Sequence, residues 1–236
     1  MAVATSQTLA SRAATALQRL VEDAAGVSTT LRISAGQPLF GPGMSPRNVY
    51  LVVEGLLRVI DPPDGGRRIP RTLDWLGPGD FVGWSAISPG LETRFQIRAE
   101  RDTLLLPLSP RALARRMAGR PRLALEIISQ LVRRLNGVYV ETGELVRLET
   151  PQRLANCLAR LATRPAMAQA DGRWTIIRLT HADLASRTGI SRETVSLILS
   201  RWRRSGVVRT GRGRLMVDLA RLAESVALPH SQQAAG

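Results

Sequence analysis

The segment Leu179–Val208 reads LTHADLASRTGISRETVSLILSRWRRSGVV, and it carries the signals of two short helices joined by a tight turn. Thr180 is followed three residues later by Asp183, a pattern close to a capping box at the start of the first helix. Gly189 falls at the turn, where a positive φ is inexpensive for glycine, and Ser191 can cap the second helix. This order of signals predicts a helix-turn-helix.

The second helix of a helix-turn-helix presents its first residues to base edges when it lies in the major groove of DNA. Arg192 can donate two hydrogen bonds to a guanine, and Glu193 can accept one from a cytosine amine. Together with Ser196 they are the predicted base readers. Short hydroxyls and basic groups nearby suit phosphates, which position a protein without specifying sequence. The predicted phosphate contacts are Thr180, His181, Ser191, Thr194, Arg201, Arg212 and Arg214.

A glycine-rich stretch, GRGRLMV at 211–217, follows that helix and resembles the wing of a winged helix. The alternative for the whole segment is a helical hairpin with a solvated basic face. The joint presence of caps, turn glycine, reading helix and basic wing favours binding to double-stranded DNA over that alternative.

The charge balance points the same way. The chain has 236 residues and a formal net charge of +14, and arginine takes the place of lysine throughout. Absence of lysine fits a genome-wide codon bias, whereas the charge itself fits nucleic acid first and an anionic membrane second. No apolar run is long enough to span a bilayer, and the N-terminus lacks the apolar core of a secretory signal. We expect a cytoplasmic protein without a membrane partner.

Short apolar or alternating runs, separated by glycine- and proline-rich turns, fill residues 28–120. Short strands at this spacing predict an antiparallel sandwich or barrel. An amphipathic helix at Leu9–Ala24 is expected within the preceding N-terminal segment, residues 1–27. The expected strands are Thr30–Ser34, Val49–Val53, Leu56–Ile60, Arg68–Trp75, Phe81–Trp84, Phe95–Ala99 and Thr103–Leu108.

Residues 121–149 predict one long helix with a single apolar seam, because apolar positions recur there in steps of three and four. A seam of this length suits a second copy of the helix in a homodimer, and the alternative is a helix packed across its own barrel. Thr150-Pro151 then opens a C-terminal domain, residues 150–236. The predicted dimerisation residues are Leu123, Ile127, Leu131, Leu135, Val138, Thr142 and Leu145.

Several of these segments resemble the bacterial transcription regulators of the cyclic-AMP receptor protein and fumarate–nitrate regulator (CRP/FNR) family. The strongest is ISRETVSLIL at 190–199, while LVVEGLLRVI at 51–60 and GPGDFVGWSAI at 77–87 match the family's sensor domain. Residues 120–162 match its long helix, and the resemblance covers about residues 28–220. It implies an α+β fold with an N-terminal cyclic-nucleotide-binding-type β jelly roll, a dimerisation helix and a C-terminal winged helix-turn-helix.

The resemblance also implies a palindromic operator related to TGTGA-N6-TCACA, read by the family's Arg-Glu pair at Arg192 and Glu193. The receptor branch has a second arginine at the position of Leu197, and the fumarate–nitrate branch has a serine at the position of Ser196. Because that arginine is absent here, the identity of the outer bases of the operator stays open. His181 stands where the receptor branch often has arginine, so it is either a phosphate contact or an ordinary helix residue. RNA polymerase is implied as a further partner of an activator.

The sensor domain departs from the family's nucleotide-binding pattern. Its Gly-Glu position reads Gly83-Trp84, its Arg-Ser position reads Arg94-Phe95, and Val138 and Tyr139 fall near the Thr-Ser pair that contacts adenine. A buried anion that lacks these partners is poorly held, so we expect cyclic AMP not to be a strong effector. The candidate pocket for another, partly apolar effector comprises Trp84, Arg94, Phe95, Val138 and Tyr139.

The composition of the chain limits which cofactors and which activities are expected. A single cysteine, Cys157, cannot hold an iron–sulfur cluster, and neither histidine falls in the barrel to ligate a haem. We therefore expect no metal and no resident cofactor. The sensor binds another small ligand, binds nothing, or responds to oxidation of Cys157, and the sequence leaves these three open. A nucleotide-sensing module without DNA binding is a further alternative. We expect no enzyme, since no catalytic constellation appears.

Overall fold

The computed structural model describes residues 30–63, 70–88, 90–211 and 213–227. The predicted N-terminal segment 1–27, with its helix at Leu9–Ala24, lies outside these ranges.

The chain folds as two compact units. The first, called here the barrel unit, comprises Met1–Asp64 and Leu73–Tyr139, and the second, the winged unit, comprises Gly65–Thr72 and Val140–Gly236. Each unit has its own sheet, and they are described separately below.

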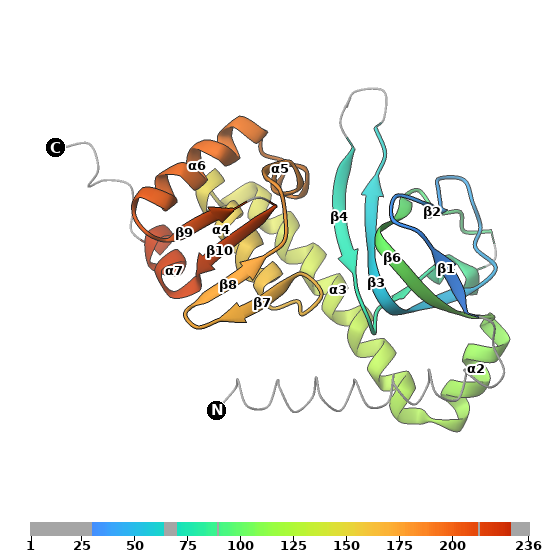
Figure 1. Cartoon of the computed structure of the whole chain (residues 1–236). Coiled ribbons are helices and arrows are strands. Elements are labelled where there is room, and N and C mark those ends of the chain that lie inside the picture. Colours follow the sequence, from blue (N-terminus) through green and yellow to red (C-terminus); the bar gives the residue numbers. More distant parts are fainter. Residues whose placement is uncertain (1–29, 64–69, 89, 212, 228–236) are drawn as a thin grey trace. The chain divides into compact units, whose positions relative to one another are not determined.

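Antiparallel strands build the barrel unit (Figure 1). Within the described ranges, β6 lies between β1 and β3, β4 follows β3, and β2 and β5 add to β6 and β3. This confirms the α+β class and the antiparallel β architecture predicted for this part of the chain. The elements are β1 (Leu31–Ile33), β2 (Pro38–Phe40), β3 (Val49–Asp61), β4 (Arg71–Leu76), β5 (Phe81–Val82), η1 (Trp84–Ile87), β6 (Gln96–Leu108) and α2 (Pro110–Gly119).

Strands β3 and β6 correct the predicted strand pattern. The predicted strands Val49–Val53 and Leu56–Ile60 are one continuous strand, β3, and the last two predicted strands are likewise joined in β6. Gly55 permits the continuity, since it has a φ of 93° and a Cβ there would lie 2.4 Å from the carbonyl oxygen of Asp102. The register between the two strands shifts around this glycine, so the strand bends at a bulge and does not end.

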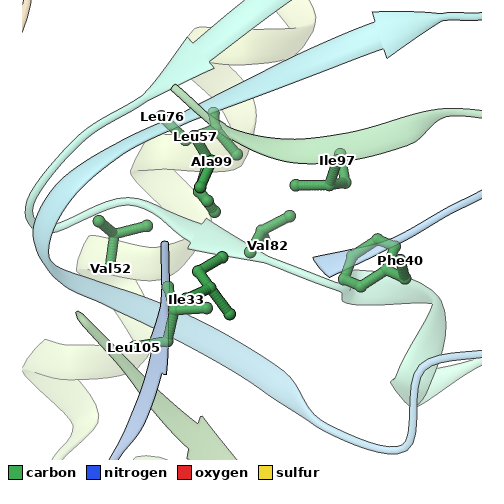
Figure 2. Packing of buried hydrophobic residues seen from close by; sticks show 9 residues of the cluster. All are labelled: Ile33, Phe40, Val52, Leu57, Leu76, Val82, Ile97, Ala99 and Leu105. Carbon is green, nitrogen blue, oxygen red and sulfur yellow. The ribbon is translucent and has the colours of Figure 1, made fainter. Parts of the chain in front are cut away.

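Apolar side chains from β1 to β6 fill the barrel unit. Figure 2 shows them pointing toward one another between the strands. Leu57 and Leu105 have no exposed surface, and full burial of one such side chain contributes about 1.5–3 kcal/mol. The cluster consists of Ile33, Phe40, Val52, Leu57, Leu76, Val82, Ile97, Ala99 and Leu105.

The predicted long helix is present as α3 (Pro121–Arg147). Its first turns lie on the barrel, because Leu123 and Ile127 are each 2% exposed and belong to a core cluster with barrel side chains. Farther along, the Arg134 guanidinium donates to the Asp80 carboxylate at 2.8 Å. Leu123 and Ile127 were predicted to lie in the dimer seam, and that part of the prediction is wrong because their own barrel covers them.

The winged unit contains a four-stranded antiparallel sheet with the order β7-β8-β10-β9. Strand β7 and the helix α7 after the wing were not predicted from the sequence. The hairpin of β9 and β10 confirms the predicted wing. The elements are α4 (Thr150–Ala162), β7 (Ala168–Asp171), β8 (Trp174–Ile177), α5 (His181–Thr188), α6 (Arg192–Arg204), β9 (Val208–Gly211), β10 (Arg214–Asp218) and α7 (Leu219–Ala227).

Candidate nucleic-acid interface

Helices α5 and α6 form the predicted helix-turn-helix (Figure 1). The capping box is complete: Thr180 Oγ1 accepts from the Asp183 backbone N–H at 3.1 Å, and the Thr180 backbone N–H donates to Asp183 Oδ2 at 2.9 Å. Gly189 ends α5 with a φ of 68°, and Ser191 Oγ accepts from the Thr194 backbone N–H at 3.1 Å. These local bonds fix the start of both helices, as the sequence predicted.

The inner face of α6 is apolar and buried, with Val195, Leu199 and Trp202 each at most 4% exposed. Leu184 of α5 and Ile190 of the turn are buried as well, at 1% and 7%. Because the helix is held by this face, its opposite face is fixed toward solvent.

The first turn of α6 presents the two predicted base readers. Arg192 and Glu193 are both exposed, next to the Ser191 cap. Leu197, one turn farther along, is 64% exposed. The exposed surface of α6 therefore combines a cation, an anion and an apolar side chain.

Ser196, the third predicted base reader, has a partner inside the protein. Its Oγ lies 2.9 Å from Nδ1 of His181, the first residue of α5. Burial and, second, the positive charge of Arg192 lower the pKa of His181 below its usual value. His181 is thus a half-buried imidazole between the two helices, and it is neutral near pH 7.

Of the remaining predicted phosphate contacts, Thr180, Ser191 and Thr194 lie at the starts of α5 and α6, and Arg201 lies in the last turn of α6. Thr180 and Ser191 serve as caps, and the Ser191 hydroxyl also lies 2.8 Å from the Thr194 hydroxyl. Arg201 is exposed on α6 and Arg214 is exposed at the start of β10. Arg212 lies outside the described residues.

A hollow of about 380 Å³ separates the start of α5 and α6 from the wing. Its charged and titratable lining residues are His181, Arg192 and Arg214, and the hydroxyls of Thr180 and Thr210 are also part of the wall. Positive groups and hydroxyl donors around one concave surface suit an anion with several oxygen acceptors. The sequence had placed most of these residues in the interface, but it gave no sign that they share a cavity wall.

An ion-pair network fixes the last turns of α3 within the winged unit. Arg187 of α5 donates to both carboxylate oxygens of Glu141, at 2.8 Å to Oε2. Arg160 of α4 donates to Glu144 at 2.7 Å, and the Asn156 amide donates to the same carboxylate oxygen at 2.9 Å. This network was not predicted from the sequence. The signal for it was a pair of acidic residues three positions apart, Glu141 and Glu144, near the end of the helix.

Cys157 lies inside this network and is 3% exposed. Burial raises the pKa of its thiol to about 11. A thiolate is the reactive form of cysteine, so at neutral pH this thiol is both shielded and unreactive. The geometry argues against the hypothesis that the protein responds to oxidation at Cys157.

The five residues of the candidate effector pocket differ in their surroundings. Trp84 packs against the barrel core, with its ring centroid 5.6 Å from that of Phe81. Arg94 is exposed, and Phe95, Val138 and Tyr139 are 40%, 58% and 65% exposed. Trp84 therefore acts as barrel packing, and the pocket stays a prediction.

A row of apolar side chains is exposed along α3. Its steps alternate between three and four residues, the spacing of a two-stranded coiled coil. Exposure reaches 63% at Leu125 and 86% at Val146. Of the predicted seam, Leu135 and Thr142 belong to this row, while Leu131, Val138 and Leu145 flank it. The row, called here the α3 seam, consists of Leu125, Ile128, Val132, Leu135, Tyr139, Thr142 and Val146.

The described part of the chain also bears on membranes and metals. None of its helices is long and apolar enough to cross a membrane. Among the same residues, histidine, cysteine and carboxylate side chains nowhere gather in groups of three or more that could hold a metal ion.

Comparison with known proteins agrees with this arrangement. Residues 30–119 match the cyclic nucleotide-binding domain family, and residues 152–225 match the Crp-like helix-turn-helix domain family. The cyclic AMP receptor protein of Thermus thermophilus is 34% identical over 195 residues, covering 81% of this chain and 85% of that protein. The chain belongs to the CRP/FNR family.

Other relatives of this CRP/FNR-family protein are also transcription regulators. The transcriptional regulator LdrP of Thermus thermophilus is 30% identical over 192 residues, covering 81% of this chain and 93% of LdrP. The crystal structure of a CRP/FNR-family transcriptional regulator from the same organism has a TM-score of 0.69 at 28% identity, covering 85% of this chain and 99% of that chain. The protein is a DNA-binding transcription regulator.

Proposed function

We propose that this regulator binds as a homodimer to a two-fold symmetric operator related to TGTGA-N6-TCACA, without control by cyclic AMP. The observation that carries the proposal is the position of Arg192 and Glu193. They are exposed side by side at the start of a helix whose inner face is buried and whose first turn is capped by Ser191. Arginine and glutamate at this place suit the guanine and cytosine of one half-site.

The α3 seam supports the homodimer. Seven positions in strict three-four alternation, of which all but Thr142 hold a large apolar side chain, are exposed to water, and a second copy of the same helix covers such a row. Two reading heads joined by paired helices fit a palindrome, since the symmetry of an operator mirrors that of the protein. RNA polymerase is the further partner we propose for activation.

The replacement of the ribose-binding glutamate by Trp84 supports the absence of control by cyclic AMP. An indole cannot accept hydrogen bonds from ribose hydroxyls. The single cysteine and the residue types of the barrel also lead us to propose that no metal, haem or iron–sulfur cofactor takes part.

A second candidate function is gating by another small effector in the barrel. One observation favours it: the indole N–H of Trp84 is buried and has no hydrogen-bond partner within the described residues. A ligand with one acceptor among apolar groups would satisfy this donor.

The base-reading role is tested with Arg192→Ala in a fluorescence-anisotropy titration on the operator and on random DNA. We expect the variant to lose about 1–3 kcal/mol on the operator and to discriminate less against changes of the guanine it reads. Arg203→Ala, an exposed arginine near the other end of α6, is the matched control. Equal loss on both DNAs by Arg192→Ala would refute base reading.

A further inference from the structure

His181 has a position that its role as one more phosphate contact does not explain. The Nδ1 atom of this residue is 2.9 Å from the Ser196 hydroxyl of the reading helix, so it joins α5 directly to a predicted base reader. It also lines the 380 Å³ hollow together with Arg192 and Arg214. A titratable group is therefore placed between the base-reading helix and a cationic concavity.

In the free protein, the charges that face this imidazole favour its neutral form. Burial lowers the pKa of His181 most, and the guanidinium of Arg192 on α6 lowers it further. Arg214 of β10 also lines the hollow. The nearest carboxylate on its own helix, that of Asp183, is engaged by the Thr180 hydroxyl at 2.7 Å and the Thr180 backbone N–H.

The other charged groups packed against α5 lie at its opposite end. Arg160 of α4 pairs with Glu144, and Arg187 in the last turn of α5 pairs with Glu141. They are committed to the network that fixes α3. The environment of His181 is thus set by the hollow, and whether the imidazole carries a second proton will depend on what the hollow contains.

A DNA phosphate in the hollow reverses this balance. Its negative charge offsets those of Arg192 and Arg214 and attracts a proton to the imidazole. We propose that His181 gains a proton when a DNA phosphate enters the hollow, so that operator binding by this protein tightens as the pH falls. This inference rests on the proposed DNA-binding function and adds a regulating ion, the proton, to the same site.

Protonation also changes what Ser196 can do. A neutral His181 with an unprotonated Nδ1 accepts a hydrogen bond from the Ser196 hydroxyl, whereas an imidazolium must donate from Nδ1 and leaves Ser196 as the acceptor. The hydroxyl proton of Ser196 is then free to be donated to a base edge. The base-reading surface thus gains one donor in the protonated state.

The sign follows from linkage. The free protein holds its proton only below the ordinary histidine range, because the pKa of His181 is lowered, whereas the DNA-bound protein holds it at higher pH. Between these two pKa values binding takes up protons, and affinity rises as pH falls. Below the lower pKa both states are protonated and the dependence ends. One proton taken up per protomer gives at most about a tenfold change in affinity per pH unit for each protomer, and therefore at most about 100-fold per pH unit for a homodimer on its operator.

The test is an anisotropy titration of the full chain on the operator between about pH 8 and pH 5.5 at constant ionic strength, since salt alone changes DNA affinity strongly. We expect the wild-type protein to tighten about 10-fold between pH 7.5 and 6.0 beyond the change seen for His181→Gln. His230→Gln removes the chain's other histidine and should retain the full wild-type dependence. Parallel curves for wild type and His181→Gln would overturn the proposal.

A second measurement does not depend on a variant. The chain has only two histidines, so their ring-proton NMR signals can be assigned with the His230→Gln protein. We expect the pKa of His181 to lie below its usual value in the free protein and to rise when the operator is added. An unchanged pKa in the presence of bound operator refutes proton uptake. Absence of operator binding at every pH would instead refute the proposed function.

Discussion

The winged unit has both its fold and the polar residues of its candidate site, whereas the barrel unit has its fold without one polar residue that the family resemblance implies for its ligand site. In the winged unit the caps at Thr180 and Ser191, the turn at Gly189 and the exposed Arg192–Glu193 pair are all in place. In the barrel unit the strands and the core are in place, but the position of the nucleotide-binding glutamate holds Trp84, which packs on the core. A fold depends on many apolar and turn positions, whereas a ligand site depends on a few polar ones.

The difference has a physical basis. Replacing a polar pocket residue by an aromatic one gains packing contacts, as the contact of Trp84 with Phe81 illustrates. A change in the first turn of a reading helix has no such compensation, because that surface faces solvent. A barrel of this kind can therefore exchange a polar pocket residue for an aromatic one and stay stable, while a reading head cannot exchange its polar residues without changing the DNA it binds.

The first test of this comparison asks whether the barrel unit contributes to DNA binding mainly through the α3 seam. The double change Val132→Glu and Leu135→Glu places like charges in the seam and should yield a monomer. We expect an operator affinity at least about 100-fold weaker, because two half-sites are no longer engaged together. Analytical ultracentrifugation and anisotropy measure the two effects.

Ser129→Glu is the matched control for that change, since it adds a charge to an exposed polar position of the same helix outside the seam. It should leave the dimer and the affinity as in the wild type. A double variant that remains dimeric would contradict the assignment of the seam.

A second test concerns the ion pairs that hold α3 in the winged unit. Arg187→Met removes the bidentate partner of Glu141 and leaves that partly buried carboxylate with only the longer contact, 3.7 Å, to Arg160. We expect the free energy of unfolding, measured in urea, to fall by about 1–3 kcal/mol, because both side chains are only partly shielded from solvent. Arg178→Met, at an exposed position, is the control and should change stability by less than about 0.5 kcal/mol. A loss no greater than that of the control would show that the pair is not stabilising.

The smallest effect is expected from cyclic AMP. Addition of about 1 mM nucleotide should change the operator affinity less than twofold. Trp84 offers no acceptor to the ribose, and Phe95 stands in place of the serine of the family's Arg-Ser pair. Isothermal titration calorimetry should show no saturable heat. Saturable binding at micromolar concentration would remove the contrast between the two units.

The helix-turn-helix was predictable because its signals are local. Caps act over three residues and a turn glycine acts on itself, so both can be read from a short stretch of sequence. The paired strands around Gly55 were not predictable in the same way, since the need for glycine comes from a backbone oxygen at Asp102, far along the chain.

The α3 seam shows a second reason why part of the structure could not be predicted from the sequence. Two apolar stripes run along this helix at nearly the same spacing, one through Leu123 and Ile127 and one through Leu125 and Ile128. Periodicity shows that both exist, but only the tertiary structure shows which one the barrel covers. The Glu141–Arg187 pair was missed for the same reason, because its members are 46 positions apart in the chain.

Leu197, exposed on α6, has a consequence for any cell that contains several regulators with the same Arg-Glu pair. Leucine has no donor for guanine, but it makes an apolar contact with the methyl group of thymine. We expect promoters with thymine at that position to be bound by this regulator and those with guanine to be left to its relatives. One apolar side chain would thus separate the promoters of this regulator from those of its relatives.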